Sequence, residues 1–289
     1  MLRNSIIGAA GSSGLPSIDL SEFVYNPDKS SVYDNSGDGE TEIPDLALNV
    51  KRGVSVKLDG TRVWLTNRNR REVYGITLGA AWDWSSSSIT NQWFTPNFIE
   101  TPPLWGDDGN ICYFFSDFPK TAFRYTASTP YNINTLTYTG DFDFSSIRPY
   151  DDSAYEYVLK DGSRWGTIDG SRASFQVDMP IPYSFSGASV VSNTPVYLPF
   201  DEDPNVFNKP NCGWFNRNGK LFVKGGLQGI TSYKLGTAYD VSTAVETGFV
   251  NTENTFGQVY CVALNEDLDK MMTAQFGLGT GVRFCIYEK

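Results

Sequence analysis

From about residue 50 to the end of the chain, short segments rich in apolar residues alternate with short polar turns. Within each stretch of about fifty residues, this pattern predicts four short antiparallel strands. We place them in the first stretch at residues 53–58, 62–66, 72–78 and 89–94, and in the fourth at residues 212–215, 220–224, 230–235 and 245–250. The last stretch offers three strands, at residues 259–264, 270–276 and 282–287. The pattern therefore predicts an all-β protein.

The predicted strands belong to an internal repeat. The sequence LGAAWDWS at residues 78–85 returns 157 positions later as LGTAYDVS at residues 235–242. Two weaker copies lie between them, TPYNIN at residues 129–134 and IPYSFS at residues 181–186. We expect the Gly or Pro to bend the chain out of a strand, the aromatic residue to wedge between units, and the Asp or Asn to close an Asx turn. A unit of about fifty residues is typical of propeller blades.

A second marker has nearly the same period. Turn pairs separated by 49, 53 and 57 residues occur at Asp59-Gly60, Asp108-Gly109, Asp161-Gly162 and Asn218-Gly219. Such pairs favour hairpin turns because both residues tolerate positive φ. An apolar residue follows four places after the first residue of each pair, namely Val63, Cys112, Trp165 and Phe222. A degenerate fifth copy follows at Asn265-Glu266-Asp267, with Met271 as the apolar residue, which makes five units.

We therefore predict a five-bladed β-propeller over residues 50–289, preceded by an N-terminal arm or docking segment over residues 1–49. Two stacked β-sandwiches are the alternative, but the regular unit favours the propeller. A last blade with three strands would leave an open edge, which proteins normally cover. We expect an N-terminal strand, within residues 43–50, to complete it.

Composition limits the classes of function. The chain has 289 residues, a formal net charge of −10 and a pI near 4.6, so electrostatic binding to nucleic acid or to an anionic membrane is not expected. The four cysteines lack close pairing and are interpreted as small buried hydrophobes. No apolar run approaches the length of a membrane span, and the N-terminal end lacks a convincing signal peptide, so we expect no secretion.

The chain contains no histidine, which excludes the Ser-His-Asp triad and the usual zinc ligand. Carboxylate chemistry of the glycosidase type remains, with Glu156 as its best candidate but without an evident partner. The other acidic groups, Asp141 and Asp143 and the triplet at residues 201–203, fall in predicted loops or at an outer strand end. We interpret all of these as solvated charges and expect no catalytic residue.

Two possible ligand sites stand out. Residues 34–45, DNSGDGETEIPD, place oxygen ligands at positions 1, 3, 5, 9 and 12 of a calcium loop. No flanking helices are predicted, however, and position 12 holds Asp, so we expect neither a metal nor a cofactor. Most tryptophans stand at strand positions that suit packing between blades. Trp84 and Trp105 are the candidates for an exposed face that binds a ligand such as a sugar.

Units with an Asp-Gly hairpin followed by Tyr-x-Leu-x-x-x-Trp/Tyr-Asp-x-Ser resemble the β-propeller repeats of structural proteins in tailed bacteriophages. The cleanest matches are residues 76–85 and 233–242, and the third unit departs most, with Ile181-Pro182 in place of Leu-Gly. The opening RNSIIGAAG at residues 3–11 is similar to the arms that begin phage virion proteins. The resemblance implies a virion structural component and transfers no catalytic residue.

The sequence thus predicts a non-enzymatic, tail-associated virion protein, assembled in the host cytoplasm and present in many symmetric copies. Its arm, through Leu2, Arg3, Ile6 and Ile7, would dock on neighbouring virion proteins. The alternative is a lectin-like propeller that binds host glycans through Trp84 and Trp105. A glycosidase acting through Glu156 is the third possibility.

Overall fold

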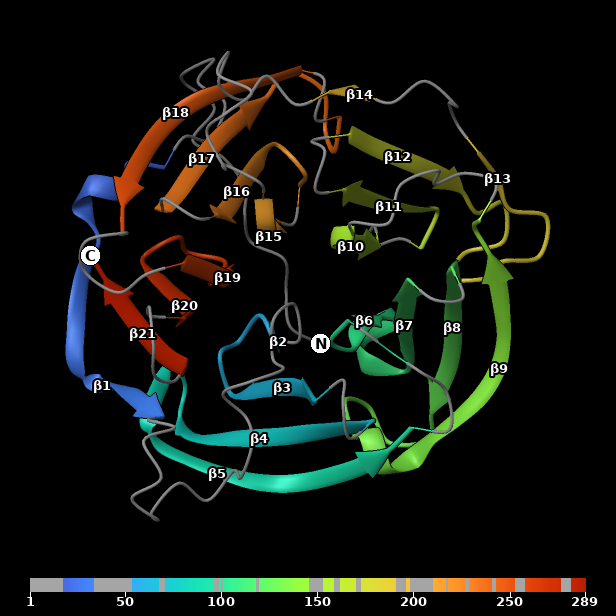
Figure 1. Ribbon diagram of the computed structural model, residues 1–289, viewed down its shortest axis with the longest axis horizontal. Coiled ribbons are helices and arrows are strands. Elements are labelled where there is room, and N and C mark those ends of the chain that lie inside the picture. Colours follow the sequence, from blue (N-terminus) through green and yellow to red (C-terminus); the bar gives the residue numbers. More distant parts are fainter. Residues whose placement is uncertain are drawn as a thin grey trace, which may run out of the picture.

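The computed structural model describes residues 18–33, 54–67, 71–95, 99, 101–117, 120–145, 153–158, 162–169, 173–190, 196–197, 210–216, 218–226, 229–240, 243–252, 258–276 and 282–289. The described strands form antiparallel sheets that surround a central axis, as the blades of a propeller do (Figure 1). The all-β prediction and the propeller arrangement are therefore confirmed.

Three sheets follow the chain in simple order. Their strands are β2 (Val54–Val56), β3 (Arg62–Asn67), β4 (Glu72–Ala80) and β5 (Asp83–Phe94); β6 (Leu104–Gly106), β7 (Ile111–Asp117), β8 (Lys120–Ala127) and β9 (Leu136–Asp143); and β15 (Pro210–Phe215), β16 (Leu221–Gly226), β17 (Gly229–Leu235) and β18 (Ala244–Asn251). In each, the first strand lies nearest the axis and the last lies at the rim (Figure 1).

The last sheet joins the two ends of the described chain. Its order is β1 (Val24–Tyr33), β21 (Val282–Glu288), β20 (Lys270–Phe276) and β19 (Gln258–Leu264). β1 runs antiparallel to β21, with Val24 opposite Glu288 and Tyr25 opposite Tyr287. An N-terminal strand thus completes this sheet, as predicted. Its predicted position was wrong: residues 43–50 lie outside the described residues, and β1, which the sequence analysis assigned to the arm, takes the place beside β21.

The remaining sheet is irregular. It contains β10 (Ser153–Val158), β11 (Arg164–Asp169) and β12 (Ala173–Asp178), followed by two strands of two residues each, β13 (Ser189–Val190) and β14 (Val196–Tyr197). Both short strands pair with β12. Four sheets therefore have the regular form of a four-stranded blade. The unit whose sequence departs most from the repeat is the one whose outer strand is divided.

Stacked aromatic rings pack neighbouring sheets together. The pairs are Trp84 with Phe284 (ring centroids 3.8 Å apart), Trp93 with Phe114 (5.4 Å) and Phe115 with Trp165 (5.3 Å). They join the first sheet to the last, the first to the second, and the second to the irregular one. Large buried rings in such pairs contribute both apolar burial and stacking, so packing between sheets is the main use of these tryptophans.

Three outer strands share a β-bulge that a threonine stabilises. The register shifts at Gly75, Arg124 and Ser232, on the neighbouring strands β4, β8 and β17. At each shift, the hydroxyl of an outer-strand threonine donates to that residue's carbonyl over 3.2 Å. The donors are Thr90 in β5, Thr139 in β9 and Thr247 in β18. Thr90, Thr139 and Thr247 therefore occupy equivalent positions in the three outer strands. A bulge of this kind twists the edge of a sheet.

All four cysteines are buried and reduced, as expected from the sequence. Burial raises the pKa of the thiols, to about 12 for Cys261 and Cys285. Because the thiolate is the reactive form, a thiol reagent at pH 8 is expected to leave the native protein unlabelled and to react with four thiols after denaturation. Rapid labelling of the native protein would contradict this burial.

Candidate functional site: the repeated clamps and the closing junction

The aromatic residue of each repeat has a left-handed backbone and is bonded to the hairpin glycine of its own unit. The φ angles are 61° for Trp82, 61° for Tyr131, 58° for Tyr183 and 59° for Tyr239. Each N–H donates to the carbonyl of Gly60, Gly109, Gly162 or Gly219, respectively, over 2.8 to 2.9 Å. The two sequence markers of the repeat therefore meet in one structural feature, which we call the clamp.

The aromatic ring of each clamp lies directly over the glycine. A β-carbon added to Gly60 would lie 2.1 Å from Nε1 of Trp82, and one added to Gly219 would lie 2.3 Å from Cδ2 of Tyr239. The corresponding distances are 2.4 Å at Gly109 and 2.5 Å at Gly162. Glycine is therefore required at this position for two reasons: its φ is positive, and the aromatic ring occupies the space where a side chain would lie. In the last sheet, Leu268 with φ of 58° stands at the corresponding turn.

The polar residue after the aromatic closes the turn, as the sequence predicts. Oδ1 of Asp83 accepts from the N–H of Ser85 at 3.0 Å, and Oδ1 of Asn132 accepts from the N–H of Asn134 at 3.0 Å. The N-terminal segment repeats this turn, because Oδ1 of Asp19 accepts from the N–H of Ser21 at 2.9 Å. This copy was not predicted from the sequence. Its signal is the sequence Asp-Leu-Ser at residues 19–21, which matches Asp-Trp-Ser at 83–85 and Asp-Val-Ser at 240–242.

Three of the four clamps, those of Tyr131, Tyr183 and Tyr239, are also tied to the preceding sheet through the carbonyl of the aromatic residue. Arg124 Nε in β8 donates to the carbonyl of Tyr183 at 2.6 Å, and Gln176 Nε2 in β12 donates to the carbonyl of Tyr239 at 2.9 Å. Arg62 Nη1 in β3 reaches the carbonyl of Tyr131 at 3.2 Å. A charged donor makes a stronger bond than a neutral one. These bonds cross from one sheet to the next, so the clamps act between units as well as within them.

The N-terminal segment is held by the same kind of contact. Oγ of Ser232 in β17 donates to the carbonyl of Ile18 at 3.4 Å. Ile18 and Leu20 are buried, 2% and 1% exposed, in an apolar cluster shared by β16, β17, β19 and β21. Leu20 belongs to the short 3-10 helix η1 (Leu20–Glu22) that leads into β1. Residues 18–33 therefore supply the outer strand of the last sheet together with a turn like those at Asp83 and Asn132, which lie at or just before the start of the outer strands of the first two sheets.

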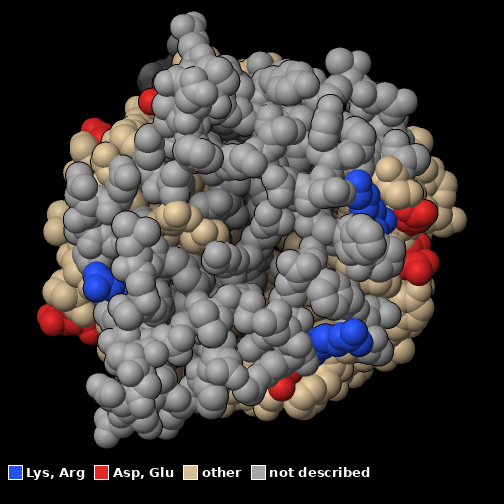
Figure 2. All heavy atoms as spheres, in the orientation of Figure 1, with Lys and Arg blue, Asp and Glu red and all other residues tan. Residues whose placement is uncertain are grey.

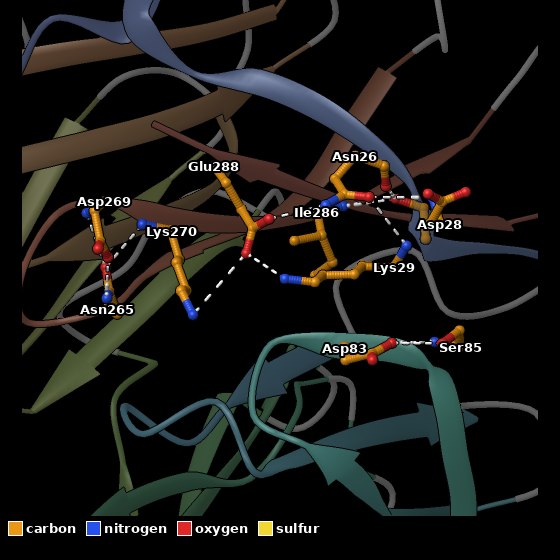
Figure 3. A network of polar contacts seen from close by, with 11 residues as sticks. Asn26, Asp28, Lys29, Asp83, Ser85, Asn265, Asp269, Lys270, Ile286 and Glu288 are labelled. Atoms are coloured by element: carbon orange, nitrogen blue, oxygen red, sulfur yellow. Dashed lines mark hydrogen bonds and ion pairs between the residues drawn. The ribbon is translucent and has the colours of Figure 1, made fainter.

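Glu288 is the polar centre of the closing junction between β1 and β21. Figure 3 shows its carboxylate between Lys29 and Lys270. Lys29 Nζ lies 2.8 Å from Oε1, Lys270 Nζ lies 3.9 Å from Oε1, and Asn26 Nδ2 donates to Oε2 at 2.8 Å. The hydrogen bond from Lys29 is the main cause that lowers the pKa of Glu288, with Asn26 and the two ammonium charges adding to it against desolvation.

Replacing Glu288 with glutamine is expected to lower stability at pH 7 by about 0.5 to 1 kcal/mol, because the ion pairs are partly exposed. The folded pKa is depressed, so the ionised group stabilises the protein above its unfolded pKa of about 4.3 and loses this effect as the pH falls through the folded pKa. Melting curves of both proteins from pH 7 to pH 3 should converge. A difference that stays constant with pH would contradict this role.

The structure corrects the expected ligand face. Trp84 was expected to be exposed, but it is 1% exposed and stacks on Phe284, so the prediction was wrong for this residue. Trp105 is half-buried between the rings of Trp64 and Tyr131, and its indole nitrogen is enclosed without a hydrogen-bond partner. Neither indole therefore offers an open stacking surface to a sugar.

Only some of the other predicted site residues lie within the part of the chain that the structure describes. Asp141 and Asp143 lie on the outer strand β9, as expected, and both are exposed. Glu156 lies on β10, but its side chain is outside the described part, as are the arm residues Leu2, Arg3, Ile6 and Ile7, the calcium-like loop at residues 34–45 and the acidic residues 201–203. Among the described side chains, no group of three or more Cys, Asp or Glu is placed to hold a metal ion. None of the described helices is long and apolar enough to cross a membrane.

No protein-family model and no curated protein matches the sequence. Among solved structures, one similar chain belongs to "Kuenenia stuttgartiensis Hydrazine Synthase". The identity is 12% and the TM-score 0.44, with 82% of this chain covered. This chain spans 58% of the length of that one, and nothing about activity is transferred from it.

Proposed function

We propose that the protein is a non-enzymatic structural component of a bacteriophage virion, associated with the tail. In this proposal it is a five-bladed propeller, in which the irregular sheet of β10–β14 is the third blade and β1 closes the ring. Leu2, Arg3, Ile6 and Ile7 of the N-terminal arm dock it on neighbouring virion proteins. Sequence resemblance to the propeller repeats of phage structural proteins supports the assignment to a virion.

One structural observation supports a role as a rigid spacer. The aromatic residues of the repeat make contacts within and between the sheets. The ring of Tyr183, for example, covers Gly162, while its carbonyl accepts a hydrogen bond from Arg124 of the preceding sheet. Tyr113 also donates its hydroxyl to that same carbonyl over 2.6 Å. A body braced between units at the same position of three repeats resists deformation, as a load-carrying part of an assembly must.

The test is to separate a lysate of the source on a density gradient and probe the fractions for this chain. The proposal predicts that the chain bands with intact particles and remains there after a high-salt wash. Full-length protein with Ile6→Asp and Ile7→Asp should melt like the wild type but remain in the soluble fractions. Detection of the wild-type chain only in soluble fractions would contradict a virion role.

A further inference from the structure

The outer edge of β5 differs from the edges of the other outer strands. β5 ends its sheet, which has the order β2-β3-β4-β5, and it lies at the rim (Figure 1). With 12 residues it is longer than β1, β9 and β18, the outer strands of the other regular sheets. An outer strand presents a row of backbone N–H and C=O groups to solvent, which can pair with another chain.

Natural proteins protect such edges with charges, proline or glycine, and three outer strands here do so. β1 contains Pro27, Asp28 and Lys29; β9 contains Gly140, Asp141 and Asp143; β18 contains Glu246 and Gly248. The outer strands of the irregular sheet have two residues each, and a very short edge is also protected. These devices keep the corresponding edges from pairing with another strand.

β5 has none of these protections in residues 88–94, Ser-Ile-Thr-Asn-Gln-Trp-Phe. This segment is uncharged, has neither glycine nor proline, and is rich in residues that favour strands. Phe94 is 64% exposed and Ile89 is 38% exposed, and Ser88, Thr90 and Gln92 are also exposed. The bulge at Thr90 recurs in β9 and β18, so it does not distinguish β5 from them. What distinguishes residues 88–94 is the lack of charge.

The composition of the segment identifies its partner. An antiparallel pair of two copies, centred on Asn91, would place Thr90 opposite Gln92 and Ile89 opposite Trp93 of the other copy. Polar side chains would then meet polar ones, apolar side chains would meet apolar ones, and no charges would be brought together. The chain carries a net charge of −10, so two copies repel one another least where no carboxylate is present. In the view of Figure 2, the described Asp and Glu side chains lie around the periphery and do not form one patch.

We propose that two copies of this chain associate through residues 88–94 of β5, which pair antiparallel across a two-fold axis. The two four-stranded sheets then become one continuous eight-stranded sheet. The contact is isologous, since the same surface is used on both copies, and it therefore closes at a dimer. This inference concerns the isolated protein and does not depend on the proposed virion role.

The test is the mass of the full-length protein in solution, measured by sedimentation up to ~100 μM, a range that reveals weak dimers. The wild type should dimerise as its concentration rises. Ser88→Lys should weaken association at least tenfold, because the pairing centred on Asn91 places position 88 opposite Phe94 of the other copy, where a lysine ammonium would lose water against an apolar ring. The matched control is Thr137→Lys, which places lysine at the equivalent exposed position of β9, two residues before Thr139; it should dimerise like the wild type.

Hydrogen exchange provides a second measurement that loss of folding cannot mimic. Amides of residues 88–94 should become protected as the wild-type concentration rises, while those of β9 and β18 should not change. A wild type that stays monomeric throughout, larger open-ended assemblies, or equal effects of the two lysine substitutions would each overturn the proposal.

Discussion

Replacing Gly219 with alanine is expected to destabilise the protein by about 3 kcal/mol, which combines left-handed backbone strain with overpacking. The added β-carbon would lie 2.3 Å from Cδ2 of Tyr239, and φ at Gly219 is 66°. The ring cannot retreat freely, because the N–H and the carbonyl of Tyr239 are both bonded, to Gly219 and Gln176. The thermal midpoint should fall by roughly 6 to 10 °C.

Gly187→Ala is the matched control for this substitution. Its φ is 75°, but the nearest atom to an added β-carbon is Pro180 Cγ at 3.2 Å, so mainly the backbone strain of about 1 kcal/mol should appear. A double variant with Tyr239→Ala separates the clash further, since removal of the ring should abolish the steric part of the Gly219→Ala effect. Equal losses for Gly187→Ala and Gly219→Ala would show that the ring over the glycine does not determine the requirement.

Removing residues 1–33 is expected to have the largest effect of all, a fall in the thermal midpoint of well over 10 °C. The deletion opens the edge of β21 and uncovers the apolar cluster that holds Ile18 and Leu20. A finer version is Leu20→Ala, for which a buried leucine predicts a loss of about 2 to 4 kcal/mol.

Val24→Ala is the control for the closing segment. Val24 opens β1 but is 69% exposed, so its truncation should change stability by less than about 0.5 kcal/mol. A deletion variant that melts like the full chain, or a Leu20→Ala protein as stable as Val24→Ala, would show that the N-terminal segment does not hold the last sheet closed.

The repeat made most of the strands predictable from the sequence. The predicted segments at 62–66, 270–276 and 282–287 coincide with β3, β20 and β21, and no bound differs by more than one residue. The turn pairs were also predictable, because a hairpin with glycine at positive φ has few alternatives. The meeting of the aromatic residue with this glycine was not predictable, since it requires the register of the strands that separate them.

The two errors have distinct physical causes. The exposure predicted for Trp84 overlooked Ile133, which stands at the same place in the second unit and is completely buried. That position points between sheets, so a large apolar residue there belongs to the core. The closing strand was misplaced because β1 contains Asn26-Pro27-Asp28-Lys29, which reads as a turn and not as a strand. Backbone pairing with β21 and the contacts of Glu288 compensate for this unfavourable sequence.

Closure of the last sheet by β1 is the feature on which the propeller interpretation most depends, and one covalent cross-link tests it directly. Val24 and Glu288 are opposite one another in the β1–β21 pair, where antiparallel Cα atoms are close enough for a disulfide. The full chain with Val24→Cys and Glu288→Cys is predicted to form an intramolecular disulfide on mild oxidation, to remain a single chain on non-reducing gels, and to melt at a higher temperature than its reduced form. Introduced thiols that stay unlinked, or that link only different chains, would contradict a ring closed by its own N-terminal strand.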